Sequence, residues 1–162
     1  MILAHDQIRQ CLESGAISID PFEAENLREG SYSFTLSDEY IEAQYSAEII
    51  DLRHGNPSVV HKTMPEKGLI LAPQSFFLCQ TRETLTLGSA YSCLLSGRRS
   101  CAQIGLNVLQ SSQYAEPGTN QKIILEMTNV GLKPVIIFPG MKVVKGIFVP
   151  VTTRAISAAI AA

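Results

Sequence analysis

Short apolar segments, separated repeatedly by glycine or proline, constrain the fold of this chain more than any other feature. The segments that favour strands are 68–72, 76–81, 84–87, 91–96, 106–110, 122–128, 134–138 and 142–149. Turn residues such as Pro73, Gly88, Gly97, Gly131 and Gly140 stand between many of them. Many short strands with frequent turns predict a mostly β domain, a sandwich or jelly roll, and argue against a parallel α/β sheet.

The first half of the chain has two other periodicities. Apolar residues recur at helical spacing over 4–12 and Gly15 supplies a stop, so a short N-terminal helix is predicted. Hydrophobic and polar residues alternate over 32–37, which predicts a half-buried strand. Residues 22–30 are polar and turn-like, and 48–67 resemble a long connection that contains one strand.

Length and composition favour one cytoplasmic domain. The chain has 162 residues, which we divide into a β domain over 1–150 and a short tail over 151–162. The tail either frays, which we favour for a terminus, or forms a short helix packed on a neighbour. A net charge of -2 gives no overall basic field for a nucleic-acid polymer. No apolar stretch is long enough to span a membrane, and the N-terminus lacks the features of a signal peptide. The cysteines and histidines are too scattered for a zinc site, and no metal ligands are predicted.

The densest polar cluster follows Gly97 and contains Arg98, Arg99 and Ser100. Guanidinium groups bind phosphate bidentately and the hydroxyl adds a donor, so this cluster suits a polyanion. A helical turn after Gly97 would direct backbone N–H groups at the same charge. The alternative is an exposed loop whose arginines only solvate the surface.

Glu126 stands out because it lies within an apolar run. Strand alternation places it on the same face as Lys122 and Ile124, while the intervening apolar residues face the other way. The side chain either points to solvent or faces a pocket. In a pocket, desolvation would raise the pKa of Glu126 and make it a candidate general base.

Glu116 belongs to the third candidate group, which reads Y-A-E-P-G over 114–118. Glu-Pro-Gly is a turn signal, so one interpretation is an exposed hairpin corner. The other interpretation is an acceptor for a sugar hydroxyl, beside the Tyr114 ring, which could cover a base or a sugar.

These segments together resemble the dCTP deaminase branch of the dUTPase-like superfamily. That branch carries G-R-S-S-L-A-R-x-G-L, V-H-V-T-A, I-D-P-G and a strand ending in T-L-E. The corresponding segments here are G-R-R-S-C-A-Q-I-G-L at 97–106, V-L-Q-S-S at 108–112, A-E-P-G at 115–118 and I-I-L-E at 123–126. Flanking segments also agree, so the resemblance covers most of residues 1–150.

The resemblance implies a fold and a chemistry. The fold is a distorted jelly roll of the β-clip, dUTPase-like type, assembled as a homotrimer with active sites between subunits. The substrate is a deoxynucleoside triphosphate, dCTP or dUTP, which carries Mg²⁺, and no zinc takes part. The assignments are Glu126 as the catalytic glutamate that activates water, and Arg98, Arg99, Ser100, Gln110, Ser111, Ser112 and Glu116 as substrate-binding residues.

Departures from the family pattern keep alternatives open, and the first is Arg99 in place of the first serine of G-R-S-S. The second arginine of the G-R-S-S stretch is Gln103, and the family's early S-x-D-x-R-L-G strand has Ser33 and Thr35 in place of Asp and Arg. The sugar-contacting acid is Glu116 instead of Asp, and the family tail that closes over the triphosphate is short here. A catalytically inactive trimer that acts as a nucleotide sensor or scaffold is therefore one alternative, and a dUTP diphosphatase is another.

Overall fold

The computed structural model describes residues 1–44, 49–51, 53 and 58–151, and it confirms the mostly β architecture. The helical elements are α1 (His5–Glu13), the short 3₁₀ turn η1 (Ala24–Asn26) and α2 (Arg99–Ala102). The strands are β1 (Ile17–Asp20), β2 (Leu27–Arg28), β3 (Ser31–Gln44), β4 (Ser58–Thr63), β5 (Leu69–Leu71), β6 (Phe76–Leu87), β7 (Tyr91–Gly97), β8 (Leu106–Asn107), β9 (Tyr114–Ala115), β10 (Asn120–Asn129), β11 (Val135–Ile137) and β12 (Lys142–Pro150). The N-terminal helix is present as predicted, and most of the tail lies outside the described residues.

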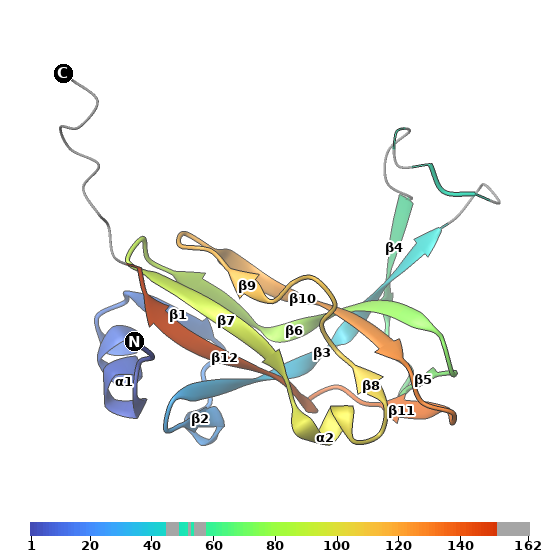
Figure 1. The fold of residues 1–162 in the computed structure, drawn as a ribbon, viewed down its shortest axis with the longest axis horizontal. Helices are drawn as coiled ribbons and strands as arrows, with labels where there is room; N and C mark the ends of the chain where they lie inside the picture. The colour runs from blue at the N-terminus through green and yellow to red at the C-terminus, as the bar shows by residue number, and fades with distance from the viewer. Residues whose placement is uncertain (45–48, 52, 54–57, 152–162) are drawn as a thin grey trace.

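The main sheet runs in the order β8-β10-β6-β3-β12-β7-β9, with β1 beside β6 and with β2 and β4 beside β3 (Figure 1). Strand β3 changes partners along its length. Residues 32–35 pair with β12, whereas residues 36–41 pair with β6. This exchange lets one long strand connect the two halves of a folded sheet, as in a jelly roll.

Strand β3 corrects the prediction of a half-buried strand, because residues 32–37 are all buried. Other strands pair with both edges of β3, and the folded sheet buries both of its faces. Polar residues on β3 therefore need hydrogen-bond partners inside the protein. Ser33 accepts a hydrogen bond from Arg98 and Thr35 donates one to Glu83. Apolar and polar residues therefore alternate along β3, and both kinds are buried. The polar side chains Ser33 and Thr35 are hydrogen-bonded within the protein.

The structure refines several other predicted segments in their bounds or content. The segments 76–81 and 84–87 form one continuous strand, β6. The segment 106–110 pairs only over Leu106–Asn107, and the short strand β9 was not predicted. Residues 22–30 hold η1 and β2, and the single strand expected within 48–67 is β4.

The pairing of β10 with β6 is irregular just before Glu126, where β6 carries extra residues opposite β10. The register of β10 on β6 shifts between Lys122 and Ile124. The Thr81 hydroxyl accepts from the Ile123 N–H at 2.9 Å and donates to the Glu83 carbonyl at 2.7 Å. A buried hydroxyl thus satisfies the amide at the register shift, and the strand continues in regular alternation to Glu126.

Candidate functional site

Glu126 lies on β10 and its carboxylate is enclosed by hydrogen-bond donors from one short segment. Oε2 accepts from the backbone N–H groups of Gln110, Ser111 and Ser112 at 2.9, 2.5 and 3.2 Å. Oε1 accepts from the Ser111 hydroxyl at 2.6 Å. As predicted, Glu126 shares its strand face with Ile124, and its apolar neighbours face the core. The structure therefore brings Glu126 together with three of the predicted substrate-binding residues.

The pKa of Glu126 shifts in the direction opposite to the prediction. Burial alone would raise it, but the hydrogen bonds from Ser111, Ser112 and Gln110 outweigh burial and lower the pKa to about 2. Donors that point at a carboxylate stabilise its charged form. Glu126 is therefore ionised throughout the neutral pH range, and Oε1, which carries one hydrogen bond, is its less occupied oxygen.

The segment that encloses Glu126 is itself anchored on both sides. Val108 and Leu109 are buried, and the Gln110 amide donates to Thr128 Oγ1 on the same strand as Glu126 at 2.5 Å. On the other side, the Gln113 carbonyl accepts from the Leu95 N–H at 2.9 Å. The predicted strand over 106–110 ends early because residues 110–112 turn their N–H groups towards Glu126.

A second group of predicted residues lines a hollow of about 410 Å³. It is formed by Arg98, Arg99, Ser100, Gln103 and Lys145, and we call it the cationic hollow. Lys145 was not predicted, because its place beside the arginines depends on the pairing of β12 with β7 and β3. Three cationic side chains and a hydroxyl around one hollow suit a phosphorylated ligand.

Arg98 is the best-fixed member of the cationic hollow. Its Nη1 donates to Ser33 Oγ at 2.7 Å, and its N–H donates to the Val143 carbonyl at 3.1 Å. The helical turn expected after Gly97 is α2, but the N–H groups of Cys101 and Ala102 already donate to the Arg98 carbonyl. These two amides are therefore already occupied, and an anion in the hollow would bind mainly to side chains.

Glu116 lies at a turn, as one interpretation of its sequence predicts, and it also borders a hollow. The Thr119 N–H donates to the Glu116 carbonyl at 3.1 Å, which closes the turn. The hollow has a volume of about 320 Å³, and we call it the Glu116 hollow. Its lining is Leu95, Ser112, Tyr114, Ala115, Glu116, Thr119, Gln121, Ile123 and Ile124. Ser112 connects this hollow to Glu126, because its N–H donates to the Glu126 carboxylate.

A larger hollow of about 450 Å³ lies between the end of β7 and residues 105–109, and Arg98 is its only charged lining residue. Its volume exceeds that of the other two, but the chemistry-bearing side chains line the smaller hollows. We therefore place the candidate site at the cationic hollow, the Glu116 hollow and Glu126.

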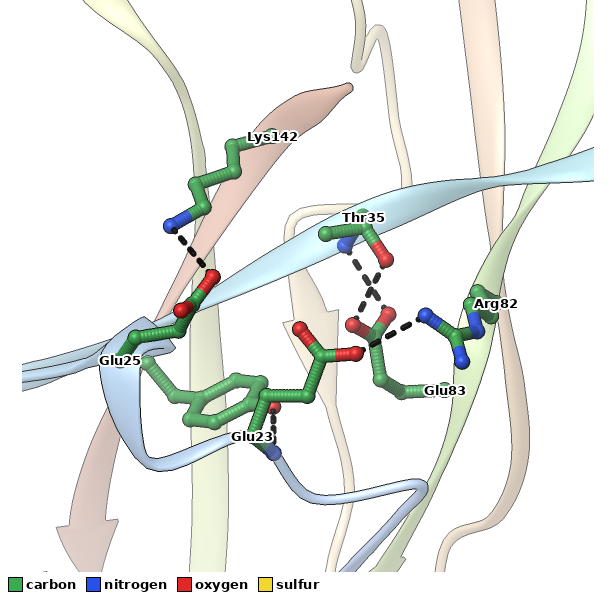
Figure 2. A network of polar contacts seen from close by, with 7 residues as sticks. Glu23, Glu25, Thr35, Arg82, Glu83 and Lys142 are labelled. Atoms are coloured by element: carbon green, nitrogen blue, oxygen red, sulfur yellow. Dashed lines mark hydrogen bonds and ion pairs between the residues drawn. The ribbon is translucent and has the colours of Figure 1, made fainter. Parts of the chain in front are cut away.

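Sequence reasoning did not single out Glu83 on β6, which is 1% exposed. Its carboxylate accepts from the Thr35 N–H at 2.9 Å and from the Thr35 hydroxyl at 2.8 Å (Figure 2). The adjacent Arg82 is directed to Glu23 instead, at 2.9 Å. Burial raises the pKa of Glu83, and the hydrogen bonds from Thr35 offset only part of that effect.

Two features are absent from the residues that the structure describes. Within that part of the chain, no group of three or more His, Cys, Asp or Glu side chains could hold a metal ion. No helix there is long and apolar enough to cross a membrane.

Comparison with solved structures identifies the fold. The chain matches a 2'-deoxycytidine 5'-triphosphate deaminase from Agrobacterium tumefaciens with a TM-score of 0.68 at 16% identity, over 91% of this chain and 46% of that one. It spans less than half of that protein. A Staphylococcus bacteriophage 80alpha dUTPase matches with a TM-score of 0.55 at 10% identity, over 88% of this chain and 94% of that one. Both matches support the dUTPase-like fold.

Sequence comparison identifies the family. A dCTP deaminase, dUMP-forming, from Persephonella marina is 29% identical over 152 residues, covering 91% of this chain and 83% of that protein. One of the same name from Beutenbergia cavernae is 29% identical over 147 residues, covering 88% and 76%. The family model described as dCTP deaminase-like matches residues 2–150. The chain therefore belongs to the dCTP deaminase-like family.

Proposed function

We propose that this protein is a dCTP deaminase that converts dCTP and water into dUTP and ammonia. The observation that carries the proposal is the position of Glu126, an ionised carboxylate fixed beside the Glu116 hollow by residues 110–112. Relatives from Persephonella marina and Beutenbergia cavernae are named dCTP deaminase, dUMP-forming, which supports a deaminase over an inactive sensor.

In the proposed reaction, Glu126 activates water without zinc. Oε1 accepts a proton from a water molecule whose oxygen attacks C4 of cytosine. That proton passes to N3 of the ring, and the remaining hydroxyl proton at C4 passes to the 4-amino group. The C4–N bond then breaks, and ammonia leaves as the C4 carbonyl forms. A carboxylate with a pKa of about 2 is a weak base, so substrate must take over some of its donors. The Ser111 hydroxyl is the donor that can rotate away from Oε1.

The other site residues receive roles from their position. Arg98, Arg99 and Ser100 bind the phosphates, which bring Mg²⁺ with them. Glu116 accepts a hydrogen bond from the deoxyribose, and Tyr114 in the same hollow covers the sugar or base. In one chain the cationic hollow and the Glu116 hollow are separate sets of residues. We therefore propose a homotrimer in which the cationic hollow of one subunit adjoins Glu126 of the next.

Product analysis tests the reaction. Purified protein with dCTP and Mg²⁺ is expected to release ammonia, and adding a zinc chelator is expected to leave the rate unchanged. Glu126→Gln is expected to lose activity by about a hundredfold or more, because it removes the proton acceptor. Glu66→Gln, at an exposed glutamate away from both hollows, is the matched control.

The nucleotide product separates related activities. Accumulating dUTP indicates deamination alone, whereas dUMP with diphosphate indicates the two-step reaction in the relatives' names. Diphosphate from dUTP without ammonia from dCTP would replace the proposal with a dUTP diphosphatase. Binding of dCTP without any turnover would make the protein a sensor. Light scattering that gives a monomer at assay concentration would contradict the shared site.

A further inference from the structure

We propose that Lys145 is a phosphate-binding residue, and that this chain holds its polyphosphate ligand with Arg98, Arg99 and Lys145. This inference rests on the proposed function, because the proposed function identifies the ligand as a nucleotide. None of the family motifs in the sequence includes Lys145. It enters the site through the fold, as the one member of the cationic hollow contributed by β12.

Strand register places Lys145 beside the guanidinium of Arg98. Lys145 is directly opposite Ser33 on β3 and opposite Ser96 on β7. Side chains at directly opposed positions of antiparallel strands lie on the same face of the sheet. Arg98 Nη1 is bonded to Ser33 Oγ at 2.7 Å, which brings that guanidinium to the same row of side chains. The lysine and the arginine therefore approach one hollow from two strands.

The charge of Arg98 is not neutralised by its partner. The family strand has an aspartate where this chain has Ser33, so the guanidinium here bonds to a neutral hydroxyl. Among the described residues, no carboxylate lies within 4 Å of the charged groups of Arg98, Arg99 or Lys145. The cationic hollow thus concentrates three positive charges in a chain whose net charge is -2.

This arrangement accounts for Gln103, which replaces the family's second arginine. Gln103 also lines the cationic hollow but contributes no charge. Arg99 and Lys145 supply cations from other positions, and Ser33 leaves the charge of Arg98 available. Because such contacts are made to phosphate, they favour ligands with more phosphate groups and contribute little to recognition of the nucleoside.

Calorimetry with four ligands tests the inference: dCTP, dCMP, deoxycytidine and inorganic tripolyphosphate. Removing one charge-assisted hydrogen bond with Lys145→Met should raise the dissociation constants of dCTP and tripolyphosphate by about tenfold to a hundredfold. The change should be smaller for dCMP and under about twofold for deoxycytidine. Lys145→Arg should retain tight binding. Lys142→Met is the control, since its ammonium lies on the same strand 3.9 Å from Glu25.

Inorganic tripolyphosphate separates the two proposals. If Lys145→Met binds dCTP and tripolyphosphate as tightly as wild type, the inference is wrong, whatever the enzymatic activity. If wild type binds tripolyphosphate through Lys145 but binds no deoxynucleotide, the phosphate site stands and the deaminase proposal is wrong. If wild type binds neither ligand, both are wrong. Thermal unfolding of each variant confirms that the compared proteins are folded.

Discussion

Glu126 and Glu83 are two carboxylates on neighbouring strands whose environments shift their pKa values in opposite directions. Glu126 is half-buried and receives three backbone N–H groups and one hydroxyl, which lower its pKa to about 2. Glu83 is buried on β6 and receives two donors, both from Thr35. There burial is the largest effect and the pKa is raised.

The difference shows that the balance between hydrogen-bond donors and burial sets the pKa of each carboxylate. Many donors favour the ionised form, and burial with few donors favours the neutral form. Glu126 is only half-buried and has one oxygen less occupied, whereas Glu83 is 1% exposed. The partner of Glu83 is the uncharged Thr35, which stands where the family strand carries an arginine. We therefore assign chemistry to Glu126 and a structural role to Glu83.

Truncating the buried carboxylate should have the largest effect on stability. Glu83→Ala leaves the Thr35 N–H and hydroxyl without partners and creates a cavity, so the free energy of unfolding should fall by about 3 kcal/mol. Glu126→Ala, at a half-buried position that water can reach, should lower it by about 1 kcal/mol. Urea unfolding followed by circular dichroism measures both. Equal losses would remove the distinction between the two sites.

Replacing each glutamate by glutamine should give changes of opposite sign. Glutamine at 126 keeps an acceptor but loses the charge that four donors stabilise, so the protein should lose about 1 kcal/mol at pH 7. Glutamine at 83 keeps an acceptor for the Thr35 N–H and can donate to its hydroxyl, while removing a buried charge. That variant should be as stable as wild type or more stable at pH 8. Urea unfolding measures the stability of both variants. A clear loss of stability in Glu83→Gln would contradict the account.

The pH dependence of stability should follow the two shifts. For Glu126, the folded pKa lies below the ordinary value of 4.5, so its contribution is present above pH 4.5 and is lost as pH falls towards about 2. For Glu83, the folded pKa lies above 4.5, so its contribution is present below pH 4.5 and is lost as pH rises through the folded pKa. In urea unfolding at a series of pH values, Glu126→Gln should remove only the loss of stability at low pH. Glu83→Gln should remove only the loss of stability as pH rises above 4.5.

The smallest effect should come from Ser111, which donates its hydroxyl to Oε1 of Glu126. Ser111→Ala removes that one bond and leaves the three backbone donors, so stability should fall by about 0.5 kcal/mol. The pKa of Glu126 should rise but stay below 4.5. Ser100→Ala, in the cationic hollow, is a control that should leave this pKa unchanged.

Sequence patterns predicted the strands and the face on which Glu126 lies, because alternation and turn residues are local signals. Family resemblance assigned Gln110, Ser111 and Ser112 to substrate binding, but it did not predict that they donate to Glu126. Their orientation depends on β8 ending early, and no local pattern marks that end.

Glu83 and Lys145 depend on pairings between distant strands. Glu83 meets Thr35 across 48 residues of sequence, and Lys145 meets Arg98 through the pairing of β12 with β3 and β7. No local pattern marks the Glu83 contact, because only the pairing of β3 with β6 brings Thr35 to Glu83.

Carbon-13 NMR titration of the glutamate side-chain carboxyl groups tests the central claim most directly, with Glu126→Gln and Glu83→Gln used for assignment. We predict that the Glu126 signal stays that of an ionised carboxylate from pH 7 down to at least about pH 3.5, consistent with a pKa of about 2. The Glu83 signal should titrate above pH 4.5. A midpoint for Glu126 at or above 4.5 would contradict the account.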